Sequence, residues 1–100
     1  MRIVLTADPE VPVPPIGYGG IERIVDALVR YLRRQGHEVC LVAHADSRAP
    51  AHQTVAWPGR SSRSALGTWR NALTLRRATR EFRADVVHSF SRLAYLAPLL

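Results

Sequence analysis

The sequence of 100 residues predicts an open, doubly wound α/β domain with a mostly parallel sheet and helices on its faces. Short, continuously apolar runs, typical of strands buried on both faces, alternate with longer segments of helical periodicity. The first connection is rich in proline and glycine, as loops are. Apolar residues make up 47% of the chain, which is enough for a core and argues against disorder.

The first half of the chain predicts a strand, a loop, a helix and a second strand. Residues 2–7 (RIVLTA) form an apolar run, residues 8–20 form the loop, and residues 39–43 (VCLVA) form the second strand. Gly36 is placed to end the helix in the left-handed conformation. The helix begins at Ile21, and its apolar residues recur at helical spacing, so we expect a buried stripe of Ile21, Ile24, Val25, Leu28, Val29 and Leu32. The opposite, solvent-facing side is expected to carry Glu22, Arg23, Asp26, Arg30 and Arg33.

The second half predicts a short strand at 54–57, a helix at 61–82, a strand at 84–89 and a final helix that Ser91 can cap. Such sheets usually contain more strands than these, and the last helix is cut off by the chain end. We therefore expect a truncated, N-terminal piece of a longer protein. The buried positions expected in the long helix are Leu66, Trp69, Ala72, Leu73 and Phe82.

The charge of the chain is strongly positive. All 14 basic residues are arginine, and they face eight acidic residues, for a net charge of +6. Arginines at 70, 76, 77, 80 and 83 cluster on the long helix, where they predict either a solvated face or a surface that meets anions. This arginine cluster lacks the interleaved aromatic platform on which proteins stack the bases of a single-stranded nucleic acid. We expect no nucleic-acid partner, and an anionic membrane is the more plausible partner for this helix.

Two further features bear on the compartment. The single cysteine, Cys40, has no partner within the chain, which fits a reducing compartment. The start of the chain does not resemble a signal peptide, and no apolar stretch reaches the roughly 20 residues that span a bilayer.

The glycine-rich stretch at 17–20 precedes the first helix and is the strongest candidate for a binding site. Free N–H groups and the helix dipole at such a terminus suit a phosphate. A dinucleotide fingerprint does not fit, because Glu22 stands where its third glycine would be. A P-loop is excluded because the chain has no lysine. The alternative is that the glycines only permit a sharp entry into the helix.

Three motifs occur in order along the chain: GGIE at 19–22, GHEV at 36–39 and DVVH at 85–88. Together they resemble the start of the family 4 glycosyltransferases, which have the GT-B fold of two Rossmann-like domains. The resemblance implies that residues 1–100 are a truncated, acceptor-side N-terminal domain. The donor domain would lie outside them, so we expect this piece alone to be inactive.

The resemblance also implies the chemistry. A sugar would pass from a nucleotide-sugar donor to a sugar or lipid-linked acceptor, usually with retention and without a metal or other cofactor. Backbone amides of Gly19 and Gly20 would bind the donor diphosphate, and Gly17 and Tyr18 would shape the loop. We expect a cytoplasmic protein that takes part in carbohydrate biosynthesis, and a peripheral contact of the basic helix around residues 76–83 with the inner face of the membrane.

Candidates for the acceptor side lie at, or directly after, the carboxyl ends of the first and last predicted strands. Five residues are expected at this edge, where open α/β sheets bind ligands: Asp8, His88, Ser89, Phe90 and Arg92. His88 is the one candidate for a catalytic side chain, with packing under the next helix as its alternative. The family often has a second histidine where this chain has Phe90, which suggests an apolar or stacking contact. His37 and Glu38 belong to the opposite edge and favour a structural role.

Two other functions remain open from the sequence. A non-catalytic nucleotide- or phosphate-binding α/β module is disfavoured because its usual acidic cluster and phosphate loops are lacking. A nucleic-acid-binding fragment rests on charge alone. His44 and His52 have no metal-ligand spacing to a cysteine or carboxylate, so no metal is expected.

Overall fold

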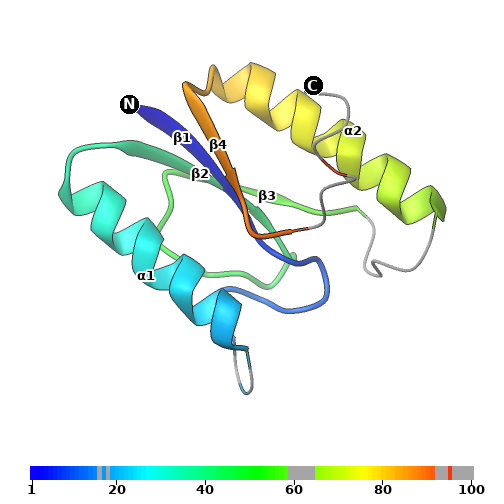
Figure 1. Cartoon of the computed structure of the whole chain (residues 1–100), viewed down its shortest axis with the longest axis horizontal. Coiled ribbons are helices and arrows are strands. Elements are labelled where there is room, and N and C mark those ends of the chain that lie inside the picture. Colours follow the sequence, from blue (N-terminus) through cyan, green and yellow to red (C-terminus); the bar gives the residue numbers. More distant parts are fainter. Residues whose placement is uncertain (16, 18, 59–64, 92–94, 96–100) are drawn as a thin grey trace.

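The computed structural model describes residues 1–15, 17, 19–58, 65–91 and 95. Four parallel strands form one sheet in the order β3-β2-β1-β4. Helix α1 covers one face of the sheet and helix α2 covers the other (Figure 1). This three-layer arrangement confirms the predicted α/β class. The elements are β1 (Arg2–Thr6), α1 (Gly20–Arg34), β2 (Glu38–Ala43), β3 (Gln53–Ala56), α2 (Ala65–Phe82) and β4 (Val86–Ser89).

The two central strands are buried on both faces, as their apolar runs predict. Ile3 of β1 pairs with Val39 of β2, and Val4 pairs with Cys40. Since successive side chains point to opposite faces, the first pair packs under α1 and the second under α2. Burial raises the pKa of the Cys40 thiol to about 11, so this thiol stays protonated at neutral pH.

Helix α1 packs on the sheet along a different line from the predicted stripe. Val25 and Val29 are fully buried, but Ile21 and Ile24 are 52% and 58% exposed, so their predicted burial is wrong. Glu22, expected in solvent, is only 7% exposed. The sheet meets the line from Glu22 through Val25 to Val29, which leaves Ile24 on the flank, while Ile21 faces a hollow at the strand ends.

Helix α2 also turns a different face to the core. Ala72 and Phe82 are buried as predicted, but Leu66, Trp69 and Leu73 are exposed. The contact line runs along positions spaced by four, three and four residues, namely Asn71, Leu75, Ala78 and Phe82. The predicted leucines and tryptophan lie on the other side of the helix, so that part of the prediction is wrong.

Aromatic side chains complete the core on the α2 side. The Trp57 and Tyr95 rings lie 4.9 Å apart, and Asn71 Nδ2 donates to the Tyr95 hydroxyl at 3.2 Å. Trp57 Nε1 donates to the carbonyl of Ala7 at 2.7 Å. These contacts hold the Tyr95 side chain in the core between α2 and the sheet. The final helix expected after Ser91 lies outside the described residues.

Polar contacts hold the amino edge of the sheet. The amino group of Met1 lies 3.0 Å from His37 Nδ1, and Arg2 forms an ion pair with Glu38. Asp85 accepts a hydrogen bond from the Arg2 backbone N–H at 2.8 Å. His37 and Glu38 therefore lie at the edge opposite the glycine loop. Gly36 has a φ of 88°, the left-handed conformation predicted for the residue that ends α1. Within the described residues, neither helix has the length and apolarity to cross a membrane.

Candidate functional site

Two hollows lie at the carboxyl edge of the sheet, on either side of the proline-rich loop. The first, which we call the acidic hollow, has a volume of about 340 Å³ and is lined by Asp8, Glu10, Val11, Ile21, Glu22 and Phe90. The second, which we call the proline hollow, has a volume of about 530 Å³ and is lined by Pro12, Pro14, Pro15, Asp46 and Arg48. The carboxyl edge is where open parallel sheets bind ligands, so these hollows define the candidate site.

The N-terminus of α1 opens at the same edge. Its first intrahelical hydrogen bond runs from the Arg23 N–H to the Gly19 carbonyl at 3.1 Å. The N–H groups of Gly20, Ile21 and Glu22 precede that bond and have no partner within the helix. Gly19 is the N-cap residue, and no side chain caps the helix there. Backbone donors and the positive end of the helix dipole therefore converge at this point.

The two adjacent glycines differ in their surroundings. A Cβ at Gly19 would lie 2.8 Å from Pro15 Cβ and 3.2 Å from Glu22 Oε1. A Cβ at Gly20 would meet none of the described residues within 4 Å. Gly19 is thus required for close packing of the loop, whereas Gly20 faces open space.

The Gly19→Ala variant is expected to be less stable than wild type by about 1–3 kcal/mol, because the added methyl group forces the proline-rich loop away from α1. The backbone of Gly19 is extended (φ 167°), so the cost is steric rather than conformational. Thermal melting of the full-length protein measures it. Gly17→Ala is the control, since a Cβ there lies within 4 Å of no residue in the described part of the chain. Equal melting temperatures for the two variants would contradict the close contact.

Glu22 is a buried carboxyl group in the first turn of α1, and it lines the acidic hollow. Burial raises its pKa, a hydrogen bond from its own backbone N–H lowers it in part, and the negative charge of Asp8 raises it further. One of the three free amides at the helix terminus is therefore already engaged by this carboxylate. The residue was expected on the solvent face. Its position two residues after the glycine pair, in the first turn of α1, was the signal that it lies beside the candidate site.

The raised pKa of Glu22 makes stability depend on pH. The folded state holds the Glu22 proton more tightly than the unfolded chain. The contribution of Glu22 to stability is therefore fully present below its ordinary pKa of 4.5 and is lost as pH rises through the raised folded pKa. We expect Glu22→Gln to remove that loss and to melt higher than wild type at neutral pH. Melting curves across this pH range measure the difference. Glu81→Gln, an exposed change on α2, should leave the pH dependence of wild type in place.

Arg23 is the second site residue that the sequence placed only in solvent. Its guanidinium donates a hydrogen bond to the carbonyl of Gly17 at 2.7 Å, across the glycine loop. This contact holds a positive charge beside the open amides of α1. Nothing in the helical pattern distinguishes Arg23 from other exposed arginines, because the contact depends on how the loop folds back.

The acceptor-side candidates are partly brought together. Asp8 and Phe90 both line the acidic hollow, and the His88 ring stacks on Phe90 at 4.7 Å with 9° between the planes. Ser89 instead joins a cluster of hydroxyl groups, 2.9 Å from Thr6 Oγ1 and 3.0 Å from Ser91 Oγ. This cluster ties the carboxyl ends of β1 and β4 together. Tyr18 and Arg92 lie outside the described residues.

The charge around the acidic hollow is negative. Asp8, Glu10 and Glu22 contribute carboxyl groups, and no basic side chain of the described residues lines it. Carboxylates accept hydrogen bonds from hydroxyl groups but repel phosphate. The hollow therefore suits a polyhydroxylated molecule, while the α1 terminus beside it suits an anion. Within the described ranges, no group of three or more histidine, cysteine, aspartate or glutamate side chains is placed to hold a metal ion.

Comparison with known proteins identifies the family. The family model for Glycosyltransferase Family 4 matches residues 18–100. The chain belongs to this family. A solved glycosyltransferase from Rickettsia africae ESF-5 superposes with a TM-score of 0.69 at 18% identity, over 98% of this chain and 26% of that one. At this identity the likeness shows the fold, and this family 4 chain spans about a quarter of that structure. No curated protein sequence matches this chain.

Proposed function

We propose that the full-length protein containing this chain transfers a sugar from a nucleotide-sugar donor to an acceptor, with retention and without a metal. Residues 1–100 would supply the acceptor-side part and one edge of the donor site. The observation that carries the proposal is the open space over Gly20, next to amides that lack intrahelical partners. Membership of the glycosyltransferase family supports the reaction class.

The glycine loop would bind the diphosphate of the donor. The amides of Gly20 and Ile21, together with the dipole of α1, would receive the phosphate oxygens. Arg23, held against the Gly17 carbonyl, adds a positive charge at this end of the helix. These groups are fixed before the reaction, so they would stabilise the charge on the departing nucleoside diphosphate without reorganising.

The acidic hollow would hold the sugar end of the acceptor. Asp8 and Glu22 can accept hydrogen bonds from sugar hydroxyls, and the stacked rings of His88 and Phe90 offer a flat wall. His88 is exposed and is the candidate for contact with the reacting hydroxyl. A neutral sugar fits this hollow better than a phosphate group. The acceptor is thus a free sugar or the sugar end of a lipid-linked chain, and the reaction would occur in the cytoplasm.

The proposal is tested on the full-length protein with nucleoside diphosphates and nucleotide sugars. UDP, GDP and ADP are titrated calorimetrically, and release of each diphosphate from its nucleotide sugar is then followed with and without acceptor sugars. We expect binding of one diphosphate and turnover of its sugar, both sensitive to Gly20→Asp. Diphosphate binding without any turnover would instead favour the non-catalytic phosphate-binding module. Neither binding nor turnover would overturn both hypotheses.

A further inference from the structure

Helix α2 carries a regular stripe on the side that faces away from the sheet. Its residues are spaced by three, four, three and four, and we call them the α2 stripe: Leu66, Trp69, Leu73, Arg76 and Arg80. The three apolar members are 59%, 61% and 41% exposed. An exposed tryptophan between two exposed leucines is unusual on a solvated helix. The first half of the stripe is thus apolar and the second half is basic.

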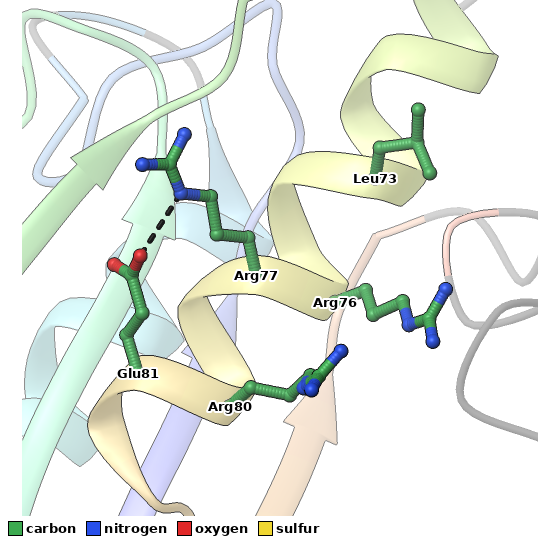
Figure 2. A pocket seen from close by; sticks show the side chains of 5 residues that line it. All are labelled: Leu73, Arg76, Arg77, Arg80 and Glu81. Carbon is green, nitrogen blue, oxygen red and sulfur yellow. Dashed lines mark hydrogen bonds and ion pairs between the residues drawn. The ribbon is translucent and has the colours of Figure 1, made fainter.

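The two arginines of the α2 stripe have no acidic partner in the part of the chain that the structure describes. Arg76 and Arg80 extend to the same side of α2, beside Leu73 (Figure 2). Arg77 extends to the other side, where its Nε lies 2.9 Å from Glu81 Oε1. A shallow hollow with a volume of about 450 Å³ is lined by Leu73, Arg76, Arg77, Arg80 and Glu81. The stripe therefore ends in two positive charges that can receive anions.

We propose that the α2 stripe binds the surface of an anionic lipid bilayer. Tryptophan and leucine side chains enter the boundary between headgroups and acyl chains, where the indole keeps its N–H near water. Arginines extend their guanidinium groups to the lipid phosphates while their aliphatic stems stay on apolar surface. A helix with this division of residues lies in the plane of the membrane interface.

Two other partners fit the α2 stripe less well. A second copy of the chain related by a two-fold axis parallel to α2 would place Arg76 and Arg80 against like charges. An axis perpendicular to α2 and centred on the stripe would place them against Trp69 and Leu66, with no anion to pair with. A nucleic-acid duplex would pair with the arginines but would leave Leu66 and Trp69 in water. Only a surface with both phosphate charge and accessible hydrocarbon satisfies both halves of the stripe.

The position of the stripe is compatible with access to the candidate site. Helix α2 follows the carboxyl end of β3 and leads to the amino end of β4, so its apolar half lies toward the carboxyl edge of the sheet. The acidic hollow and the proline hollow lie at that same edge. Membrane contact would therefore bring this edge toward the lipid surface. Binding of the stripe to lipid does not itself depend on sugar transfer.

Vesicle sedimentation of the full-length protein tests the charged half. We expect binding to phosphatidylglycerol/phosphatidylcholine vesicles, weak binding to phosphatidylcholine alone, and loss of binding at high salt. Arg76→Gln/Arg80→Gln should weaken binding on the order of 20-fold, from about 5-fold per charge. The matched control is Arg33→Gln/Arg34→Gln at the exposed end of α1, which removes the same charge and should change binding little. Equal weakening by both pairs would show a diffuse charge effect and overturn the assignment to α2.

Fluorescence tests the apolar half. The difference in emission between wild type and Trp69→Phe reports Trp69, because Trp57 is buried and stays in both proteins. We expect this difference spectrum to shift to the blue on addition of anionic vesicles. An unchanged spectrum, with lower melting temperatures for Leu66→Ser and Trp69→Ser, would mean that another part of the full-length protein covers the stripe. That result overturns the membrane assignment, and it leaves the transfer assay of the glycine loop unaffected.

Discussion

The Gly20→Asp variant of the full-length protein is expected to transfer sugar about a thousandfold more slowly than wild type, with no loss of thermal stability. The new carboxylate would stand in the open space over the α1 terminus, where we place the donor diphosphate. Two unit charges about 4 Å apart repel by about 4 kcal/mol at an effective dielectric constant near 20. Each 1.4 kcal/mol corresponds to about tenfold in affinity or rate.

The same substitution should favour the fold. Aspartate in the first turn interacts well with the helix dipole, at about 0.3–1 kcal/mol, and it replaces a glycine that caps nothing through a side chain. A fall in activity together with a rise in melting temperature would show that the variant loses a binding site and keeps its structure. Turnover is measured as nucleoside diphosphate released, and stability as the melting temperature.

Gly20→Ala is the matched control for this prediction. It adds an uncharged Cβ that has no neighbour within 4 Å among the residues that the structure describes. We therefore expect it to melt no lower than wild type and to retain much more activity than the aspartate variant. If Gly20→Asp turned over the donor normally, the diphosphate could not lie over Gly20. If both variants were equally inactive, the effect would be steric, and repulsion between the carboxylate and the diphosphate would not be its cause.

The second large effect is expected in the core on the α2 side. Leu75→Ala should lower the free energy of unfolding by about 2–5 kcal/mol, because Leu75 is fully buried in the layer between α2 and the sheet. Two terms add up in this loss: the free energy of transferring the removed methyl and methylene groups from water to the core, and the cost of the cavity that they leave behind. Urea unfolding of the full-length protein, followed by circular dichroism, measures it.

Leu66→Ala is the control on the same helix. This leucine is 59% exposed, and substitutions at such positions usually change stability by less than about 0.5 kcal/mol. The hydrophobic pattern predicted that Leu66 lies in the core, so the pair tests the observed orientation of α2 directly. A larger loss from Leu66→Ala than from Leu75→Ala would mean that α2 turns its other side to the sheet.

Much of the fold could be predicted because the relevant signals are local. The apolar runs of β1 and β2 indicated strands buried on both faces, and their alternation with helices indicated parallel pairing. Gly36 indicated the end of α1 and has the left-handed conformation expected there. The glycine pair before α1 indicated an anion site, and that site stays a prediction.

The orientation of each helix was decided only by tertiary structure. Both helices carry apolar side chains around more than half of their circumference, so hydropathy alone does not say which line meets the sheet. Packing chose Val25 and Val29 in α1, and Leu75 and Phe82 in α2. Ile24, Trp69 and Leu73 were left outside as a result.

The sequence by itself thus determined the class of fold, the order of its elements and the position of the glycine loop before α1. Only the tertiary structure decided the character of the acidic hollow, because its carboxyl groups come from separate segments that meet where β1 and α1 approach each other. Asp8 and Glu22 are 14 positions apart in the sequence, and no local pattern relates them. Their proximity and their burial arise from strand register and helix packing, which are properties of the folded chain.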